Sequence, residues 1–89
     1  MRIREGYEIR QVGDEFVVIT VGNATKTFNG MIKLNPTGVF IWNKIREGID
    51  SDRLTDAFAA EYHISADVAK RDIDLFLDSL KTTGCFTDS

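Results

Sequence analysis

The sequence predicts an α+β domain in which a three-stranded antiparallel sheet precedes three helices. Two observations carry this prediction. Apolar residues recur at period two as far as about residue 34, which is typical of strands, and at helical spacing beyond it. The segment Leu34-Asn35-Pro36 then changes one pattern into the other with almost no loop, because Asn is a good N-cap and Pro is well tolerated at the first helical position.

The strands are expected within the first 34 residues. Residues 7–12 alternate, residues 15–21 are β-branched and aromatic, and Gly13-Asp14 between them can form the turn of a hairpin. Gly22-Asn23 begins a loop towards a third strand at about residues 28–34. In that strand one set of residues should face the core and the other set should not: Phe28, Gly30, Ile32 and Leu34 against Asn29, Met31 and Lys33.

Three helices should follow, each with a recognisable start or end. The first begins at Pro36 and ends near Gly48, and the second begins at a cap formed by Asp50 or Ser51 and reaches about Tyr62. The third runs from about residue 66 to 82, with Ser65 as its cap and Gly84 at its end. We expect Trp42 to anchor the core. On the third helix an inward stripe is predicted: Ala69, Ile73, Phe76, Leu77 and Leu80.

Size and charge limit the class of protein. The 89 residues suit a single domain, residues 1–89 with a core from about 7 to 86. A net charge of -3 disfavours nucleic acid as a partner, because phosphate backbones require a concentrated positive face. Neither a secretory signal nor a long apolar run is apparent, so the sequence predicts a cytoplasmic protein with no membrane partner.

The sequence gives little support for catalysis or for a cofactor. His63 is expected in the turn between two helices, and Cys85 near the end has no base placed beside it by local spacing. Glu61, His63 and Asp67 are too few to indicate a metal site. Phosphate-binding glycine motifs are absent. We therefore predict a protein that is not an enzyme and holds neither a metal nor a cofactor.

Three strands followed by three helices, the last two joined by a short turn, resemble a winged helix-turn-helix. Such a domain can present its third helix to DNA as a transcription regulator. The charge of that helix opposes this use, since four acids, Asp67, Asp72, Asp74 and Asp78, outnumber Lys70, Arg71 and Lys81. Alternatively, the open edge of the sheet can accept an extended peptide as an added strand, or can serve as a plain interaction or dimerisation surface.

A family resemblance favours peptide binding over DNA recognition and over a plain interaction surface. The sequence contains Leu34-Asn35-x-Thr37-Gly38-x-x-Ile41-Trp42, then Ala60-Glu61-Tyr62, then Val68-Ala69-x-x-Asp72-Ile73-x-x-Phe76-Leu77-x-x-Leu80 and Gly84. Over about residues 12–86 it resembles the PqqD-like family. Members of that family recognise precursor peptides that are made on the ribosome and then modified. The resemblance implies binding of a leader segment and its presentation to a separate enzyme.

The resemblance also implies where the leader lies. It would lie along the third strand, at Gly30, Met31, Ile32, Lys33 and Leu34, and against a helix flank formed by Val68, Arg71, Asp72 and Leu75. Lys33 or Arg71 would pair an acidic leader residue, while Val68 and Leu75 would receive apolar ones. Simpler interpretations stay open: Met31 and Lys33 as the solvent side of a strand, Gly30 as a bend, and Arg71 and Asp72 as a solvated helix surface.

The implied partners are a precursor leader peptide and a modifying enzyme. The enzyme would be a radical S-adenosylmethionine enzyme or a leader peptidase and cyclase of the lasso-peptide kind. No nucleic acid or membrane is expected, and the protein should be a monomer or a weak homodimer.

Overall fold

The computed structural model describes residues 2–87 and confirms the α+β class, with a three-stranded sheet followed by three helices. The chain forms two further short strands and two 3₁₀ turns. In chain order the elements are β1 (Arg2–Ile3), β2 (Tyr7–Val12), β3 (Glu15–Thr20), η1 (Gly22–Lys26), β4 (Met31–Leu34), α1 (Pro36–Arg46), α2 (Ser51–Tyr62), α3 (Ala66–Leu80), η2 (Lys81–Thr83) and β5 (Phe86–Thr87).

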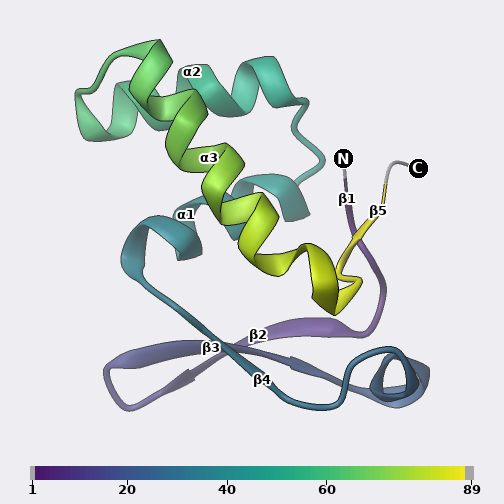
Figure 1. Ribbon diagram of the computed structural model, residues 1–89. Coiled ribbons are helices and arrows are strands. Elements are labelled where there is room, and N and C mark those ends of the chain that lie inside the picture. The colour runs from purple at the N-terminus through teal and green to yellow at the C-terminus, as the bar shows by residue number, and fades with distance from the viewer. Residues whose placement is uncertain (1, 88–89) are drawn as a thin grey trace.

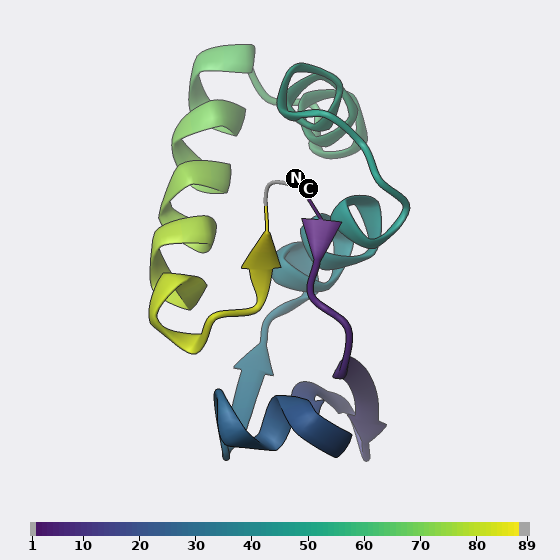
Figure 2. The same ribbon diagram turned by 90° about the vertical axis from the view of Figure 1, so that its right-hand side faces the viewer.

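The main sheet has the order β2-β3-β4, and both pairings are antiparallel. Phe16 lies opposite Leu34, and Val18 lies opposite Ile32. Figure 1 shows α1, α2 and α3 on one side of this sheet, with its other face uncovered. The two-residue strands β1 and β5 form a second small sheet. They stand side by side near the helices in Figure 2, so that the two ends of the described chain are paired.

The helix starts confirm the sequence prediction. The side chain of Asn35 accepts a hydrogen bond from the Gly38 N–H at 2.8 Å, and Pro36 is the first residue of α1. Asp50 caps α2, which resolves the two alternatives, and Ser65 caps α3. Each cap satisfies a backbone donor that has no partner within its helix.

The predicted third strand is too long at its start. Phe28 and Gly30 lie outside β4, which begins at Met31. The preceding chain curls instead, and the N–H groups of Thr27 and Phe28 both bond to the Ala24 carbonyl at 3.0 Å. These donors are therefore used within the turn and cannot join a ladder. The third helix also ends earlier than predicted, at Leu80, where η2 begins.

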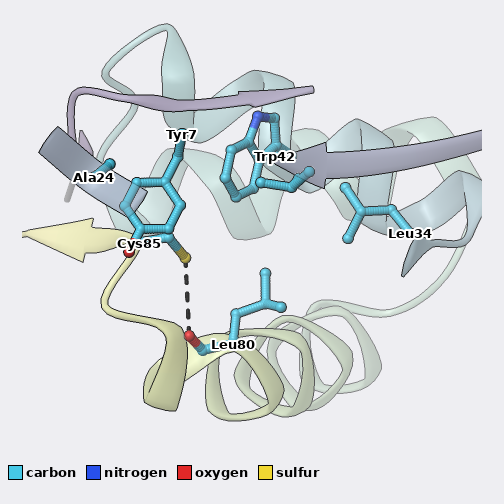
Figure 3. Packing of buried hydrophobic residues seen from close by; sticks show 7 residues of the cluster. Tyr7, Ala24, Leu34, Trp42, Leu80 and Cys85 are labelled. Atoms are coloured by element: carbon cyan, nitrogen blue, oxygen red, sulfur yellow. Dashed lines mark hydrogen bonds between the residues drawn. The ribbon is translucent and has the colours of Figure 1, made fainter. Parts of the chain in front are cut away.

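The core consists of two clusters of buried side chains. One fills the space between the sheet and the helices and contains Tyr7, Val18, Ala24, Leu34, Trp42, Leu80 and Cys85, most of which appear in Figure 3. The other joins the helices and contains Ile41, Ile45, Leu54, Phe58, Ala69 and Ile73. Trp42 is 1% exposed, as expected for a core anchor. Phe76 packs against both clusters, so α3 connects them.

The two ends of the chain are also held by polar contacts. The buried Tyr7 hydroxyl donates a hydrogen bond to the Thr83 carbonyl, and Arg4 Nε donates to the Gly84 carbonyl at 3.0 Å. Burial raises the pKa of Tyr7, and the nearby Cys85 raises it further while Arg4 lowers it. These contacts fix the C-terminal end of α3 relative to the start of β2. Among the described residues, no helix has the length and apolar character needed to cross a membrane.

We expect Tyr7→Phe to lower the free energy of unfolding by about 1–3 kcal/mol, because the buried Thr83 carbonyl loses its donor. The pH dependence has a definite sign. A raised pKa in the folded state means that the stabilisation is complete below the ordinary value of 10.0 and is lost as pH rises through the higher folded pKa. Denaturant unfolding from pH 7 to 11 should show this loss in the parent protein and not in Tyr7→Phe. In Tyr62→Phe, whose hydroxyl makes no hydrogen bond among residues 2–87, the loss should persist.

Candidate peptide-binding groove

β4 is an edge strand, and it is the element on which the candidate site depends. It pairs with β3 on one side, while no strand in the described chain pairs with its other side. Its free backbone N–H and C=O groups can therefore accept a further strand. The register places Ile32 and Leu34 on the side of the helices, with Met31 and Lys33 on the opposite face.

A cavity of about 500 Å³ lies between β4 and α3. β4 contributes its last three residues, and α3 contributes residues from its C-terminal turns. The lining consists of Ile32, Lys33, Leu34, Asn35, Phe76, Ser79 and Leu80. The cavity thus joins the free edge of a strand to an apolar floor, which is the arrangement needed to hold an extended peptide by both its backbone and its side chains.

A second cavity of about 360 Å³ continues between α1 and α3. It shares three lining residues with the first, Asn35, Phe76 and Ser79, so the two cavities adjoin. The remaining lining comprises Thr37, Ile41, Phe58, Asp72 and Leu75. We call the two cavities together the groove. Its second part has apolar side chains at its base and the exposed carboxylate of Asp72 at its margin.

The groove contains five of the nine site residues expected from the sequence. Ile32, Lys33 and Leu34 line its first part, and Asp72 and Leu75 line its second. The Leu75 side chain is 63% exposed although it is large and apolar.

The other four expected residues line neither cavity. Met31 points to the opposite face of the sheet and is 66% exposed, and Gly30 precedes the strand. Val68 and Arg71 lie nearer the N-terminal end of α3.

Sequence reasoning missed the remaining lining residues. Asn35 is accounted for as the cap of α1 and Phe76 and Leu80 as part of the core stripe, while Thr37 is predicted only as part of the family motif. Ser79 had a usable signal. It follows Asp72, Leu75 and Phe76 at helical spacing and therefore shares their face of α3.

Charges around the groove differ in whether they are already paired. Lys33 Nζ lies 2.7 Å from Glu15 Oε1, and both side chains are mostly exposed. Such an exposed pair contributes little to stability, and solvent competes with it. Arg71 and Asp72 make no ion pair within residues 2–87. Lys33 can therefore exchange its partner cheaply, while Asp72 is available to a donor that enters the groove.

The position of α3 over the groove depends on a close contact with α1. A Cβ atom added at Gly38 would lie 2.9 Å from Cε1 of Phe76 and 3.0 Å from Oδ1 of Asn35. Only glycine therefore permits this approach without movement of the Phe76 ring or of the cap. Since Phe76 lines both cavities, the contact at Gly38 positions part of the groove wall.

The described residues contain no cluster of three or more His, Cys, Asp or Glu side chains that could hold a metal ion. Cys85 is fully buried, and burial raises the pKa of its thiol. A buried neutral thiol is a poor nucleophile. The side chains that line the groove include neither His nor Cys.

Comparison with known proteins identifies the family. The model for coenzyme PQQ synthesis protein D (PqqD) matches residues 15–85. The chain belongs to the PqqD family. The matched range begins with β3 and ends just before β5, so this PqqD-family chain has both walls of the groove inside the match. Curated proteins gave no match.

Two solved structures share the fold of this PqqD-family chain. TbiB1 in complex with the TbiA(beta) leader peptide has a TM-score of 0.80 and 24% identity, over 100% of this chain and 98% of that one. The lasso peptide synthetase B1 complexed with the leader peptide has a TM-score of 0.74 and 24% identity, over 94% and 93%. At this identity the likeness establishes the fold.

We expect Gly38→Ala to destabilise the protein, because the new methyl group overpacks against Phe76 at a cost of about 1–3 kcal/mol. The gain of about 1 kcal/mol in helix propensity offsets part of this cost. Chemical denaturation of Gly38→Ala, Phe76→Leu and the double variant measures the coupling. The double variant should lose less unfolding free energy than the sum of the two single variants. A loss equal to that sum would contradict a direct contact between Gly38 and Phe76.

Proposed function

We propose that the protein binds the leader segment of a ribosomally made precursor peptide and presents it to a separate modifying enzyme. The observation that carries the proposal is the unpaired edge of β4, which forms one wall of an apolar groove. An extended leader added to this edge would be hydrogen-bonded by β4 and would contact α3. Membership of the PqqD family and the leader complexes of two proteins with the same fold support the proposal.

The backbone contribution to affinity is limited. β4 has four residues, so an added strand gains only a few hydrogen bonds, each worth about 0.5–1.5 kcal/mol net. Ordering a disordered leader costs on the order of 2–5 kcal/mol, which offsets most of that gain. Affinity and selectivity must therefore come from side chains that enter the groove.

The groove residues indicate what those side chains are. Ile32, Leu34 and Phe76 offer an apolar floor to leader residues on the helix side of the added strand. Leu75 offers a second apolar contact beside Asp72. We propose that Lys33 or Arg71 pairs an acidic leader residue. Gly30 and Met31 would flank the added strand, and Val68 would extend the helix contact.

The proposed class of the partner enzyme rests on the family resemblance, because the groove residues do not indicate it. We propose a radical S-adenosylmethionine enzyme or a leader peptidase and cyclase of the lasso-peptide kind. In either case the protein contributes position, because it raises the local concentration of the bound peptide at the enzyme. The bond-making chemistry would belong to the enzyme.

The alternative function, DNA recognition through α3, is opposed by charge. The exposed acids Asp67, Asp72, Asp74 and Asp78 lie on the helix that would enter the major groove. Lys70, one of its few cations, is paired with Asp74 at 2.9 Å. Such a helix repels phosphates, and counterion release on DNA would be small.

The deciding experiment is an amide NMR titration of the labelled protein with the leader of the short peptide encoded nearest its gene. We expect shifts at residues 31–34 and along residues 72–80, with an affinity that changes by less than about threefold between low and moderate salt. A phosphate-contacting protein would lose on the order of 10³ or more in affinity over that range. Shifts confined to α3 on addition of duplex DNA, and none with the leader, would overturn the proposal.

We expect Leu75→Asp to abolish leader binding while leaving the fold intact, since Leu75 is 63% exposed and lines the groove. The new carboxylate also adds to the negative charge of Asp72. The matched control is Ala60→Asp, which places the same charge at an exposed position of α2 outside both cavities. Calorimetric titration measures both affinities, and unchanged binding by Leu75→Asp would disprove the placement of the groove.

A further inference from the structure

The face of the sheet opposite the helices carries exposed apolar side chains although no element of the described chain covers it. Four large hydrophobic side chains are exposed in the described chain, and the strand register places two of them on this face: Val12 at 61% and Met31 at 66%. A third, Val21 at 37%, follows β3 in extended conformation with its N–H bonded to the Gly6 carbonyl, so the strand alternation carries it to the same side. Figure 1 shows no element of the chain beneath it. We call it the outer face.

The central strand contributes apolar side chains to this face as well as to the core. β3 carries a continuous apolar run in which Phe16 and Val18 face the helices while Val17 and Ile19 face outward. Such runs are typical of strands buried on both faces, whereas a half-exposed strand alternates. Val17 is only 4% exposed, and Arg10 and Lys33 lie directly opposite it on the neighbouring strands.

The charges of the outer face indicate the class of partner. Arg10 pairs with Glu8, and Lys33 pairs with Glu15, so the four charged side chains cancel within the face. A neutral face with apolar residues between charges of both signs does not attract a phosphate polymer or an anionic membrane. It suits a protein partner whose surface also mixes apolar side chains with charges of both signs.

The outer face is continuous with the edge at which the leader is proposed to bind. Met31 and Lys33 belong both to this face and to β4. In an added strand, successive side chains point to opposite faces of the sheet. One half of the leader side chains would therefore enter the groove, and the other half would extend the outer face beside Met31. This surface would be complete only when the leader is bound.

We infer that the outer face is the docking surface for the enzyme that acts on the bound peptide, which would contact the protein and the leader together. This inference rests on the proposed leader binding. It explains how an enzyme could distinguish the loaded protein from the free one without a conformational change. A flat composite surface of protein and leader would give the enzyme contacts that neither component offers alone.

The test uses Val12→Lys/Val21→Lys, which places two charges on the outer face outside the groove. Its charge-matched control is Asp56→Asn/Ala60→Lys, on the exposed side of α2. Two affinities are measured for each variant. One is its affinity for the leader used above. The other is its affinity for the peptide-modifying enzyme encoded beside that precursor, in the presence and in the absence of leader. We expect the outer-face variant to lose at least about tenfold in affinity for the enzyme and to keep the leader affinity, while the control loses neither.

The outcomes separate the two proposals. Failure of the parent protein to bind the leader would overturn the proposed function itself. Leader binding with an undiminished enzyme affinity in the outer-face variant would overturn only the docking surface. Sedimentation velocity of the leader-bound protein also tests whether the protein forms a dimer through the outer face. A dimer that the outer-face substitutions dissociate would show that a second copy of the chain covers this face, which also overturns the enzyme as its occupant.

Discussion

The contact between Phe76 and Gly38 is the constraint on which the arrangement of the groove depends. The absence of a side chain at Gly38 lets α3 cross α1 so closely that an added Cβ would lie 2.9 Å from the Phe76 ring. Phe76 then packs against both core clusters and lines both cavities. One aromatic ring thus fixes the helix wall of the groove to the core, and a change there would alter the groove because close-packed interiors transmit strain.

A second set of contacts holds the chain just beyond the C-terminal end of α3. After Leu80 the chain turns through η2 and runs back as β5, which pairs with β1. The hydroxyl of Tyr7 and the guanidinium of Arg4 bind carbonyls in this segment. The C-terminal part of α3 is therefore held against α1 at Phe76, and the segment that follows it is held against the start of the sheet. A groove held in this way would need less reorganisation to accept a peptide, which would lower the entropy cost of binding.

The sequence was sufficient for the elements whose signals are local. Asn35, Asp50 and Ser65 act as caps through side chain to backbone bonds within three residues, and such bonds can be recognised from sequence. The start of β4 could not be predicted, because the donors of Thr27 and Phe28 are used in a turn that the alternating pattern does not reveal. The pairing of β1 with β5 joins segments about 80 residues apart, and strands of two residues carry no period. Whether a residue such as Ser79 lines the groove depends on which face of α3 meets β4. Tertiary packing decides this, and local sequence patterns do not show it.

An open sheet edge is a hazard as well as a candidate binding site, and the protein limits this edge in ways that would also shape its selectivity for a peptide. The free edge is only four residues long, and Lys33 places a charge beside it. Short edges with lysine resist pairing with unrelated chains. The same shortness means that backbone hydrogen bonds alone cannot hold a disordered peptide. A peptide remains bound only if its side chains also fill the groove between β4 and α3, so the weakness of the edge gives the side-chain contacts control over which peptide binds.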